Sequence, residues 1–307
     1  MRMFELTRYS FRREQGGELA GLKRLRAFTM PDIHGILKDM DQAKKEFEMQ
    51  LELGMVWLNE VELLDECEVG FRILRSFYEE NEEWYASLVK KIGKPIVLEL
   101  FDQRYAYFIT KFEFNFIDAM EKASALTTVQ IDVENADTYD INFVAEDGSK
   151  QRPIITHASI SGSLERVIYA LLEKEAMRME KGKKAILPLW LSPTQVRIIP
   201  ISEKHVDAAR KAMELVGEGV RADLDDTTET LGKKIRNAQK EWIPYIAVIG
   251  DKEAESGKLS VNVRATDEKK DMDAAELGKT IRKETEGMPF DTLSTPLELS
   301  KRPIFHG

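Results

Sequence analysis

The apolar positions at the start of the chain follow the two-residue period of β-strands. Residues 4–13 and 20–29 both alternate apolar and polar side chains, and the sequence between them carries Gly16 and Gly17. Two alternating runs joined by a glycine pair are typical of a β-hairpin. The pattern therefore predicts a long antiparallel hairpin over residues 4–29.

A helical period replaces this alternation. Pro31 is well placed to open a helix, and apolar residues recur at helical spacing over 32–53 and over 69–92, so we expect a helical insertion at about 38–94. Strand-like alternation returns in four later segments, at 95–102, 105–118, 125–135 and 151–163. An amphipathic helix is predicted at 164–182. Antiparallel strands interrupted by helices indicate an α+β domain.

The pattern changes near residues 182–195. Beyond them, strands are predicted within 196–202, 220–226, 243–251 and 258–265, and helices within 203–219, 230–242 and 272–287. Strands that alternate with helices of this length indicate a small α/β domain with a mostly parallel sheet. We therefore expect two domains, at 1–183 and 184–307.

Composition narrows the class of protein. The 307 residues include 43% hydrophobic and 32% charged side chains, as in folded globular proteins. The formal net charge of −9 argues against a general basic nucleic-acid binder and confines such contacts to local basic patches. Cys67 is the single cysteine, so no intrachain disulfide forms and a cytoplasmic setting is expected. No apolar run reaches the roughly 18–20 residues of a membrane helix, so no membrane partner is expected.

Basic and aromatic side chains gather on the predicted hairpin. Alternate residues of a strand share a face, so Arg12 lies beside Glu14 on the first strand. On the second strand, Arg24 shares a face with Arg26 and Phe28. Arginine binds phosphate oxygens, a carboxylate can accept from an adenine amino group, and an aromatic ring can stack on a base. The set suits a nucleoside triphosphate, although a solvated strand face with ordinary ion pairs explains the same pattern.

A second group of residues joins the strand at 151–163 to the helix that follows. Gly162 and Ser163 form the turn, and Arg166 lies in the first helical turn, where phosphates bind readily. Ser163 also suits an ordinary helix N-terminus, so this signal is weak by itself.

Two of the four histidines flank these groups. His34 follows the basic hairpin and His157 precedes the glycine turn. A converging pair would suit zinc, although a catalytic zinc site normally has three protein ligands. Cys67 is the obvious soft third ligand, but its surroundings are predicted to be helical and acidic. Structural or surface roles remain open for all three residues.

Ordered blocks of the sequence resemble one enzyme family. Phe11 to Glu14 resembles motif 2 of the class II aminoacyl-tRNA synthetases, and GSLERVIYALLE, starting at Gly162, resembles motif 3. Five blocks are similar to threonyl-tRNA synthetases of the archaeal type, namely LKRLRAFTMPDIHG, TTVQIDV, THASISGSLER, PLWLSPTQVRIIPI and IPYIAVIGDKEAESGKLSVNVR. The resemblance implies an α+β antiparallel class II catalytic core, incomplete at its N-terminus, followed by a small α/β anticodon-binding domain.

The resemblance also implies roles for individual residues. The implied ATP-binding residues are Arg12, Glu14, Arg24, Phe28, Gln130, Ser163 and Arg166. The implied catalytic residues are Arg12, Lys111 and Arg166. Asp32 would contact the hydroxyl of threonine, and His34 and His157 would hold zinc. Valine is nearly isosteric with threonine, and zinc would reject it because valine lacks the hydroxyl that the metal binds. Glu255 and Arg264 would contact anticodon bases, and Mg²⁺ would accompany ATP.

Other parts of the family pattern do not occur in this sequence. In the family, the third zinc ligand is a cysteine upstream of motif 2, and motif 1, which builds the dimer interface, and any editing domain are also upstream. Met30 and Ala125 stand where polar residues occur in relatives. Three explanations are open: the C-terminal part of a longer enzyme, one half of a split enzyme whose partner polypeptide supplies motif 1 and the cysteine, or a retired core. The first is favoured because the nucleotide-site residues are all present.

The expected function is ATP-dependent activation of threonine and its transfer to tRNA(Thr), by an enzyme that is a homodimer when complete. The competing class is a non-catalytic tRNA-binding or regulatory paralogue. A synthetase for proline or histidine is a third option. Asp32, His34 and His157 argue against it because those enzymes do not need a zinc that senses a hydroxyl.

Overall fold

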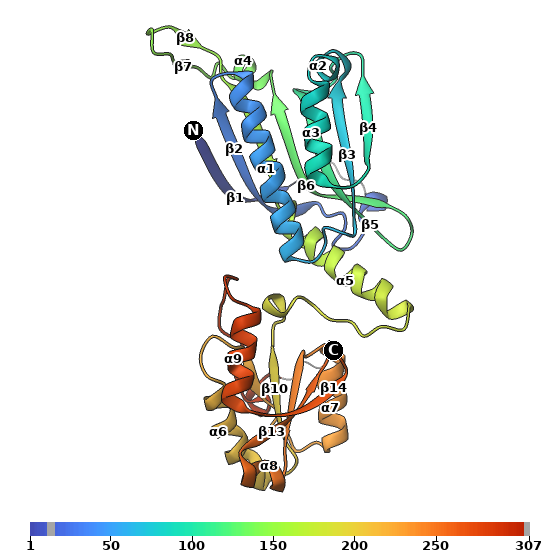
Figure 1. Ribbon diagram of the computed structural model, residues 1–307, viewed down its shortest axis with the longest axis vertical. Helices are drawn as coiled ribbons and strands as arrows, with labels where there is room; N and C mark the ends of the chain where they lie inside the picture. The colour runs from blue at the N-terminus through green and yellow to red at the C-terminus, as the bar shows by residue number, and fades with distance from the viewer. Residues whose placement is uncertain (11–15, 304–307) are drawn as a thin grey trace. The chain divides into compact units, whose positions relative to one another are not determined.

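The structure is a computed structural model that describes residues 1–10 and 16–303 (Figure 1). It divides into two compact units, Met1–Met177 and Arg178–Gly307, and each unit is built around its own sheet. The division falls within helix α5 (Leu164–Glu180). The domain boundary expected from the sequence, between residues 183 and 184, remains a prediction.

The first unit contains a seven-stranded sheet in the order β1-β2-β9-β6-β5-β3-β4. Its strands are β1 (Arg2–Ser10), β2 (Ala27–Leu37), β3 (Cys67–Leu74), β4 (Ile96–Phe101), β5 (Phe108–Ile117), β6 (Ala123–Asp132) and β9 (Ile154–Ser159). Neighbouring strands are antiparallel except β3 and β4, which run parallel. The short strands β7 (Phe143–Val144) and β8 (Lys150–Gln151) form a separate hairpin. The predicted α+β antiparallel core is confirmed.

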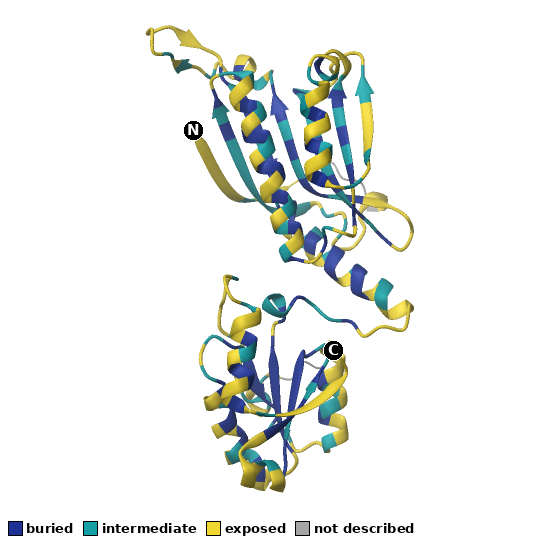
Figure 2. Cartoon of the chain, in the orientation of Figure 1, coloured by how far each residue is buried: buried dark blue, intermediate teal, exposed yellow. Residues whose placement is uncertain are grey.

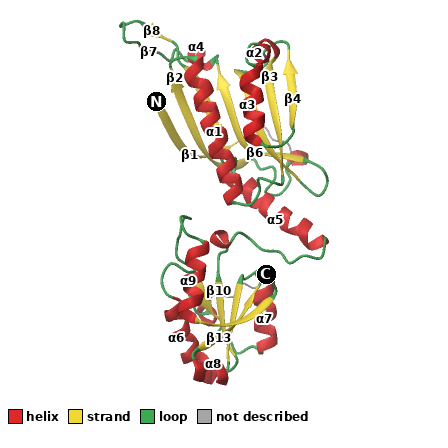
Figure 3. Cartoon of the chain, viewed as in Figure 1, coloured by secondary structure: helices red, strands yellow, loops and turns green. Residues whose placement is uncertain are grey.

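Helices α1 (Met40–Glu60) and α3 (Glu82–Ile92) lie over one face of this sheet, as Figure 3 shows. Strand β5 accounts for the arrangement because alternate residues from Phe108 to Phe116 are buried, whereas those between them, such as Lys111, are only partly buried. Figure 2 shows buried positions, in dark blue, on strands of this sheet. The ring of Phe47 on α1 packs edge-on against Phe112, with centroids 5.0 Å apart. The sheet therefore has one covered apolar face and one more open face that carries polar side chains.

The first hairpin is paired differently from the prediction. β1 pairs with β2 from Arg2 opposite Gly35 to Ser10 opposite Ala27, so the second strand starts later and ends later than residues 20–29. Residues 11–15, which the prediction places at the end of the first strand and in the turn, lie outside the described residues.

The helix predicted to open at Pro31 is wrong, because Pro31 lies within β2. Its pairing with β9 begins only at Ile33, so at Pro31 the strand has one paired neighbour, and strands tolerate proline at such positions. Helix α1 begins at Met40, where the Asp39 carboxylate caps it by accepting a hydrogen bond from the Gln42 backbone N–H at 2.8 Å. Residues 32–37 therefore belong to the sheet.

The segment 38–94 is not helical throughout, because strand β3 lies inside it and pairs with both β4 and β5. The helix predicted over 69–92 is wrong in its first part, and helices α2 (Arg75–Glu79) and α3 follow β3 instead. Residues 67–74 alternate buried and less buried positions, which is the signature of a strand. Phe71 and Leu74 are three residues apart and also fit a helical period, so this short run satisfied both patterns.

The second unit contains a five-stranded sheet in the order β11-β10-β12-β13-β14. Its strands are β10 (Val196–Pro200), β11 (Ala222–Leu224), β12 (Tyr245–Ile249), β13 (Lys258–Val263) and β14 (Glu268–Asp273). Its main helices are α6 (Val206–Val216), α7 (Leu231–Lys240), α8 (Asp251–Ser256) and α9 (Ala274–Glu284). β10 runs parallel to β11 and β12, while the pairs β12–β13 and β13–β14 are antiparallel. The sheet is thus mixed where the alternation predicted a mostly parallel one.

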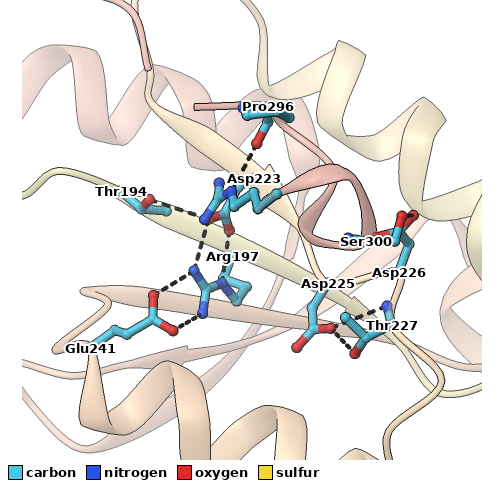
Figure 4. A network of polar contacts seen from close by, with 10 residues as sticks. Thr194, Arg197, Asp223, Asp225, Asp226, Thr227, Glu241, Pro296 and Ser300 are labelled. Carbon is cyan, nitrogen blue, oxygen red and sulfur yellow. Dashed lines mark hydrogen bonds and ion pairs between the residues drawn. The ribbon is translucent and has the colours of Figure 1, made fainter. Parts of the chain in front are cut away.

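An ion cluster around the buried side chains of Arg197 and Asp223 joins several elements of the second unit (Figure 4). The side chains of Arg197 on β10 and Asp223 on β11 are both 0% exposed, and two hydrogen bonds of 2.8 and 2.9 Å join them. Arg197 also donates to Glu241, which ends α7, at 2.7 and 2.9 Å. Arg302, near the C-terminus, donates to Asp223 at 2.9 Å. Burial alone would lower the pKa of Arg197, but its bonds to the two carboxylates raise it, so the cluster stays charged.

Candidate functional site

Side chains from six strands form one row across the open face of the first sheet. The register of the paired strands places one residue of each strand opposite a residue of the next. In the order β1, β2, β9, β6, β5 and β3, these residues are Met3, His34, His157, Gln130, Lys111 and Arg72. Adjacent strands lie about 4.8 Å apart, so each member of the row lies beside the next. The structure therefore brings together four residues that the sequence analysis singled out separately: His34, His157, Gln130 and Lys111.

The two histidines are in direct contact. Their ring centroids are 5.0 Å apart and the rings meet edge to face. Burial, and next the neighbouring His157, lower the pKa of His34, which favours the neutral imidazole that binds metals. His157 Nε2 lies 2.8 Å from Oδ2 of Asp132. Burial disfavours the charged form of Asp132, but bonds from His157 and nearby backbone N–H groups outweigh it and lower its pKa.

This pair fits part of a zinc site. A carboxylate behind a ligating histidine fixes its ring, and Asp132 holds that position. The described residues contain no group of three or more His, Cys, Asp or Glu side chains that could hold a metal. Cys67 is not the third ligand, since β9, β6 and β5 separate its strand from His34 and burial raises its pKa to about 12. Among the described residues, His34 and His157 are thus the two candidate donors at this place, and their assignment to zinc stays a prediction.

Asp32 lies on the same strand and face as His34, two residues before it. The hydroxyl of Tyr9 donates a hydrogen bond to Asp32 Oδ2 at 2.8 Å. Burial, followed by this bond, raises the pKa of Tyr9 to about 12, so the phenol remains a donor at neutral pH. Glu5 lies opposite Asp32 on β1. The acid is therefore held in position beside the histidine pair.

A pocket of about 440 Å³ opens near these residues within the first unit. It is lined by Lys23, Arg24, Leu25, Phe28, Ala123, Ser124, Ala125 and Arg166. These residues come from the segment before β2, from β2 itself, from the start of β6 and from the first turn of α5. The structure thus gathers Arg24, Phe28 and Arg166, which the sequence analysis assigned to ATP. The other two predicted hairpin residues, Arg12 and Glu14, lie outside the described residues.

Arg166 is held in the pocket by backbone groups. Its Nη1 donates to the carbonyl of Ala125 at 2.8 Å and its Nε to that of Lys23 at 3.2 Å. Gly162, which precedes α5, lies close against β6: its φ is +68°, and a Cβ there would lie 2.3 Å from the carbonyl oxygen of Leu126. The Ser163 hydroxyl accepts a hydrogen bond from the Arg166 backbone N–H at 3.1 Å, so it caps α5. Its contact with ATP stays a prediction.

Lys111 and Gln130 both have partners on the open face. Lys111 Nζ forms an ion pair with Glu113 at 2.6 Å, and the Tyr107 hydroxyl bonds the amide oxygen of Gln130. Tyr107, Glu113 and Asp132 were missed by the sequence analysis, although period-two spacing from Lys111 and Gln130 could have found the last two. Tyr9 carries no such signal, because its approach to Asp32 depends on how β1 pairs with β2.

The two residues predicted to contact anticodon bases lie apart in the second unit. Glu255 is exposed on α8, just before β13, and Arg264 follows the other end of that strand. A strand advances about 3.3 Å per residue, so the length of β13 separates them by roughly 20 Å. Arg264 donates to the carbonyls of Ala185 at 2.5 Å and Gln239 at 3.0 Å. Any contact with bases therefore involves different nucleotides, and both assignments remain predictions.

Residues 1–175 match the model of the tRNA synthetase class II core domain (G, H, P, S and T). The chain belongs to this class II synthetase family. Residues 195–284 match the model of the anticodon binding domain, so both units of this synthetase chain have a recognised counterpart. The predicted resemblance to class II synthetases is confirmed.

Curated relatives narrow the resemblance within the family. The chain is 53% identical over 309 aligned positions to a threonine–tRNA ligase of Pyrococcus horikoshii and 52% identical to one of Pyrococcus furiosus. Each match covers 100% of this chain and 49% of the relative, so the chain spans about half the length of these curated proteins. The resemblance to archaeal threonyl-tRNA synthetases is thus confirmed at the level of sequence.

Solved structures agree with the class II architecture. The RNA binding domain of threonyl-tRNA synthetase from Cryptosporidium parvum matches with a TM-score of 0.74 at 26% identity, over 94% of this chain and 71% of that one. A prolyl-tRNA synthetase of the same organism matches with a TM-score of 0.68 at 19% identity, over 92% of this chain and 52% of that one, and supports the fold alone. Among residues 1–10 and 16–303, no helix is long and apolar enough to span a membrane.

Proposed function

We propose that this chain forms the catalytic and anticodon-binding parts of a threonyl-tRNA synthetase, which activates threonine with ATP and transfers it to tRNA(Thr). The observation that carries the proposal is the placement of Asp32 beside the paired imidazoles of His34 and His157, on the open face that also bears Gln130 and Lys111. A carboxylate next to two metal-binding side chains suits an amino acid with a hydroxyl on its β-carbon. The names of the curated relatives support the same substrate.

In this proposal ATP, with Mg²⁺, occupies the pocket lined by Arg24, Phe28 and Arg166. Phe28 stacks on the adenine, Glu14 accepts a hydrogen bond from the adenine amino group, and the arginines, Arg12 among them, bind the phosphates. A carboxylate oxygen of threonine attacks the α-phosphorus of ATP. The bond between that phosphorus and the oxygen that bridges it to the β-phosphate breaks, and pyrophosphate leaves. A ribose hydroxyl of the tRNA terminus then attacks the threonyl carbonyl and AMP leaves. Positioning and charge stabilisation by the chain's cations supply the catalysis.

The two histidines define how this chain takes part in metal binding. Zinc held there would act as a Lewis acid toward the amino and hydroxyl groups of threonine. Asp132 fixes the ring of His157, the lowered pKa of His34 keeps that imidazole neutral, and Asp32 accepts a hydrogen bond from the substrate hydroxyl. We further propose that a segment outside the described residues, in the same or a separate polypeptide, supplies the third zinc ligand and the homodimer interface.

Threonine-dependent exchange of pyrophosphate into ATP tests the proposal. The assay is run on the chain alone and after addition of a polypeptide that carries motif 1 and the family cysteine, with valine as the comparison substrate. We expect exchange with threonine in at least the second condition and far less with valine. Absence of exchange in both conditions would contradict the proposal, and tRNA binding without exchange would favour the non-catalytic paralogue.

Zinc content gives an independent readout of the metal assignment. We expect close to one zinc per chain when the added polypeptide is present, and loss of that zinc in His34→Ala and His157→Ala. His205→Ala serves as the matched control and should keep its zinc, because His205 is buried and bonded to Ser202 and Asp251 in the second unit. Retention of zinc by both variants of the paired histidines would remove them from the metal site.

A further inference from the structure

Tyr9 connects the two halves of the candidate site. It lies opposite Phe28, which lines the nucleotide pocket, and the centroids of the two rings are 6.2 Å apart. Its hydroxyl donates to Oδ2 of Asp32, which lies four residues farther along the same strand as Phe28. One side chain thus contacts both the ring assigned to adenine and the acid assigned to the substrate hydroxyl.

The bond controls what Asp32 can accept. An ionised carboxylate has two oxygens that act only as acceptors, so a donor at Oδ2 leaves Oδ1 available for a substrate hydroxyl. Glu5 lies opposite Asp32, and like charges that face each other across paired strands repel. A fixed hydroxyl donor offsets that repulsion at Asp32 and holds its carboxylate in one orientation.

We propose that Tyr9 is a positioning residue for amino-acid specificity: its hydroxyl orients Asp32 so that the site selects an amino acid with a β-hydroxyl over its methyl isostere. This inference rests on the proposed function and deepens it. Neither Tyr9 nor its bond to Asp32 belongs to the residues that the family resemblance assigns. The raised pKa of Tyr9 is consistent with this role, because the phenol stays protonated throughout the neutral pH range.

Tyr9→Phe tests the proposal, because it keeps the ring that faces Phe28 and removes only the hydroxyl. Two stable adenylate mimics are used, sulfamoyl adenosines that carry threonine or valine. Their dissociation constants are measured on the full chain with zinc and with the added polypeptide that carries motif 1 and the family cysteine. A hydrogen bond to a charged group corresponds to roughly a 10-fold to 100-fold change in affinity. We expect the threonyl mimic to bind about 10-fold more weakly to the variant, with the affinity for the valyl mimic unchanged.

Tyr139→Phe is the matched control, since Tyr139 lies in the same unit and is 71% exposed. It is expected to change neither dissociation constant. The proposal is overturned if Tyr9→Phe leaves both mimics unaffected, or if it weakens both equally, since an equal loss means that Tyr9 only supports the pocket. A failure of the proposed function is distinguishable, because it shows as equal affinity for the two mimics in the chain without substitutions, measured with zinc and the added polypeptide.

Discussion

Gly162 offers a direct test of how the turn into α5 is built. Two separate costs are expected for Gly162→Ala. Its φ of +68° is a conformation that disfavours side chains, at a cost of about 1–2 kcal/mol. The added Cβ would also lie 2.3 Å from the Leu126 carbonyl oxygen, so the backbone must move, which costs about 1–3 kcal/mol more.

Gly148 separates the two costs. It lies in the turn between β7 and β8 with a φ of +81°, and no heavy atom lies within 4 Å of where its Cβ would be. Gly148→Ala therefore incurs the conformational cost alone, about 1–2 kcal/mol. The difference between the two variants isolates the close approach of Gly162 to strand β6.

Urea unfolding followed by tryptophan fluorescence measures both variants. The first unit contains Trp57 and Trp84 and the second contains Trp190 and Trp242, so the curve is fitted with one transition per unit. We expect only the transition of the first unit to shift, with Gly162→Ala shifted farther than Gly148→Ala. Equal losses in the two variants would refute the close packing of Gly162 against Leu126.

Three further predictions concern groups away from this turn. Arg197→Met leaves Asp223 buried with fewer cations, so the second unit should lose about 3 kcal/mol in the same urea experiment. Cys67 should react with a thiol reagent only after unfolding, because burial raises its pKa to about 12; labelling rates at pH 8 with and without urea measure this. The hydrogen bond from Lys23 to Asp118, at 2.5 Å, is the main cause of the lowered pKa of that carboxyl. Its stabilising contribution is therefore full above the ordinary aspartate pKa and lost as pH falls below about 4, so Asp118→Asn should differ most from the unmodified chain at neutral pH.

Each of these predictions has an outcome that contradicts it. An unchanged second transition in Arg197→Met would mean that the ion cluster contributes no net stability. Rapid labelling of the native chain would show that Cys67 is accessible. A stability difference for Asp118→Asn that stays constant from pH 7 to pH 3 would remove the role of its ionised form; thermal unfolding across that range measures it.

Strand alternation was enough to place the site-bearing strands β5 and β6. Lys111 and Gln130 fall within segments whose apolar and polar residues alternate, and a strand buried on one face produces that pattern by itself. The order of strands in the sheet is different in kind. β9 lies between β2 and β6, and nothing in the local pattern of any of them specifies those neighbours. The row of side chains therefore became visible only with the register.

Two errors in the prediction have a common physical cause. Residues 32–37 are the end of strand β2 and residues 67–74 form strand β3, and a helix follows each of them along the chain. Over six to eight positions the periods of 2 and 3.6 share several apolar positions. Pro31 strengthened the wrong choice at the first site, because proline suits both a helix start and a strand position with one paired neighbour. Pairing with neighbouring strands is a tertiary effect that selects the strand in both segments, since β2 pairs with β9 and β3 pairs with β4 and β5.

The pairing of His34 with His157 has a consequence for how the chain folds. The two residues are 123 positions apart (157 − 34), and they become neighbours only when β2 aligns with β9. Contacts between distant parts of a chain form late, because a long loop must close first. A metal ion that bridges these imidazoles would report completion of the sheet during refolding, and no peptide shorter than this span could assemble the pair.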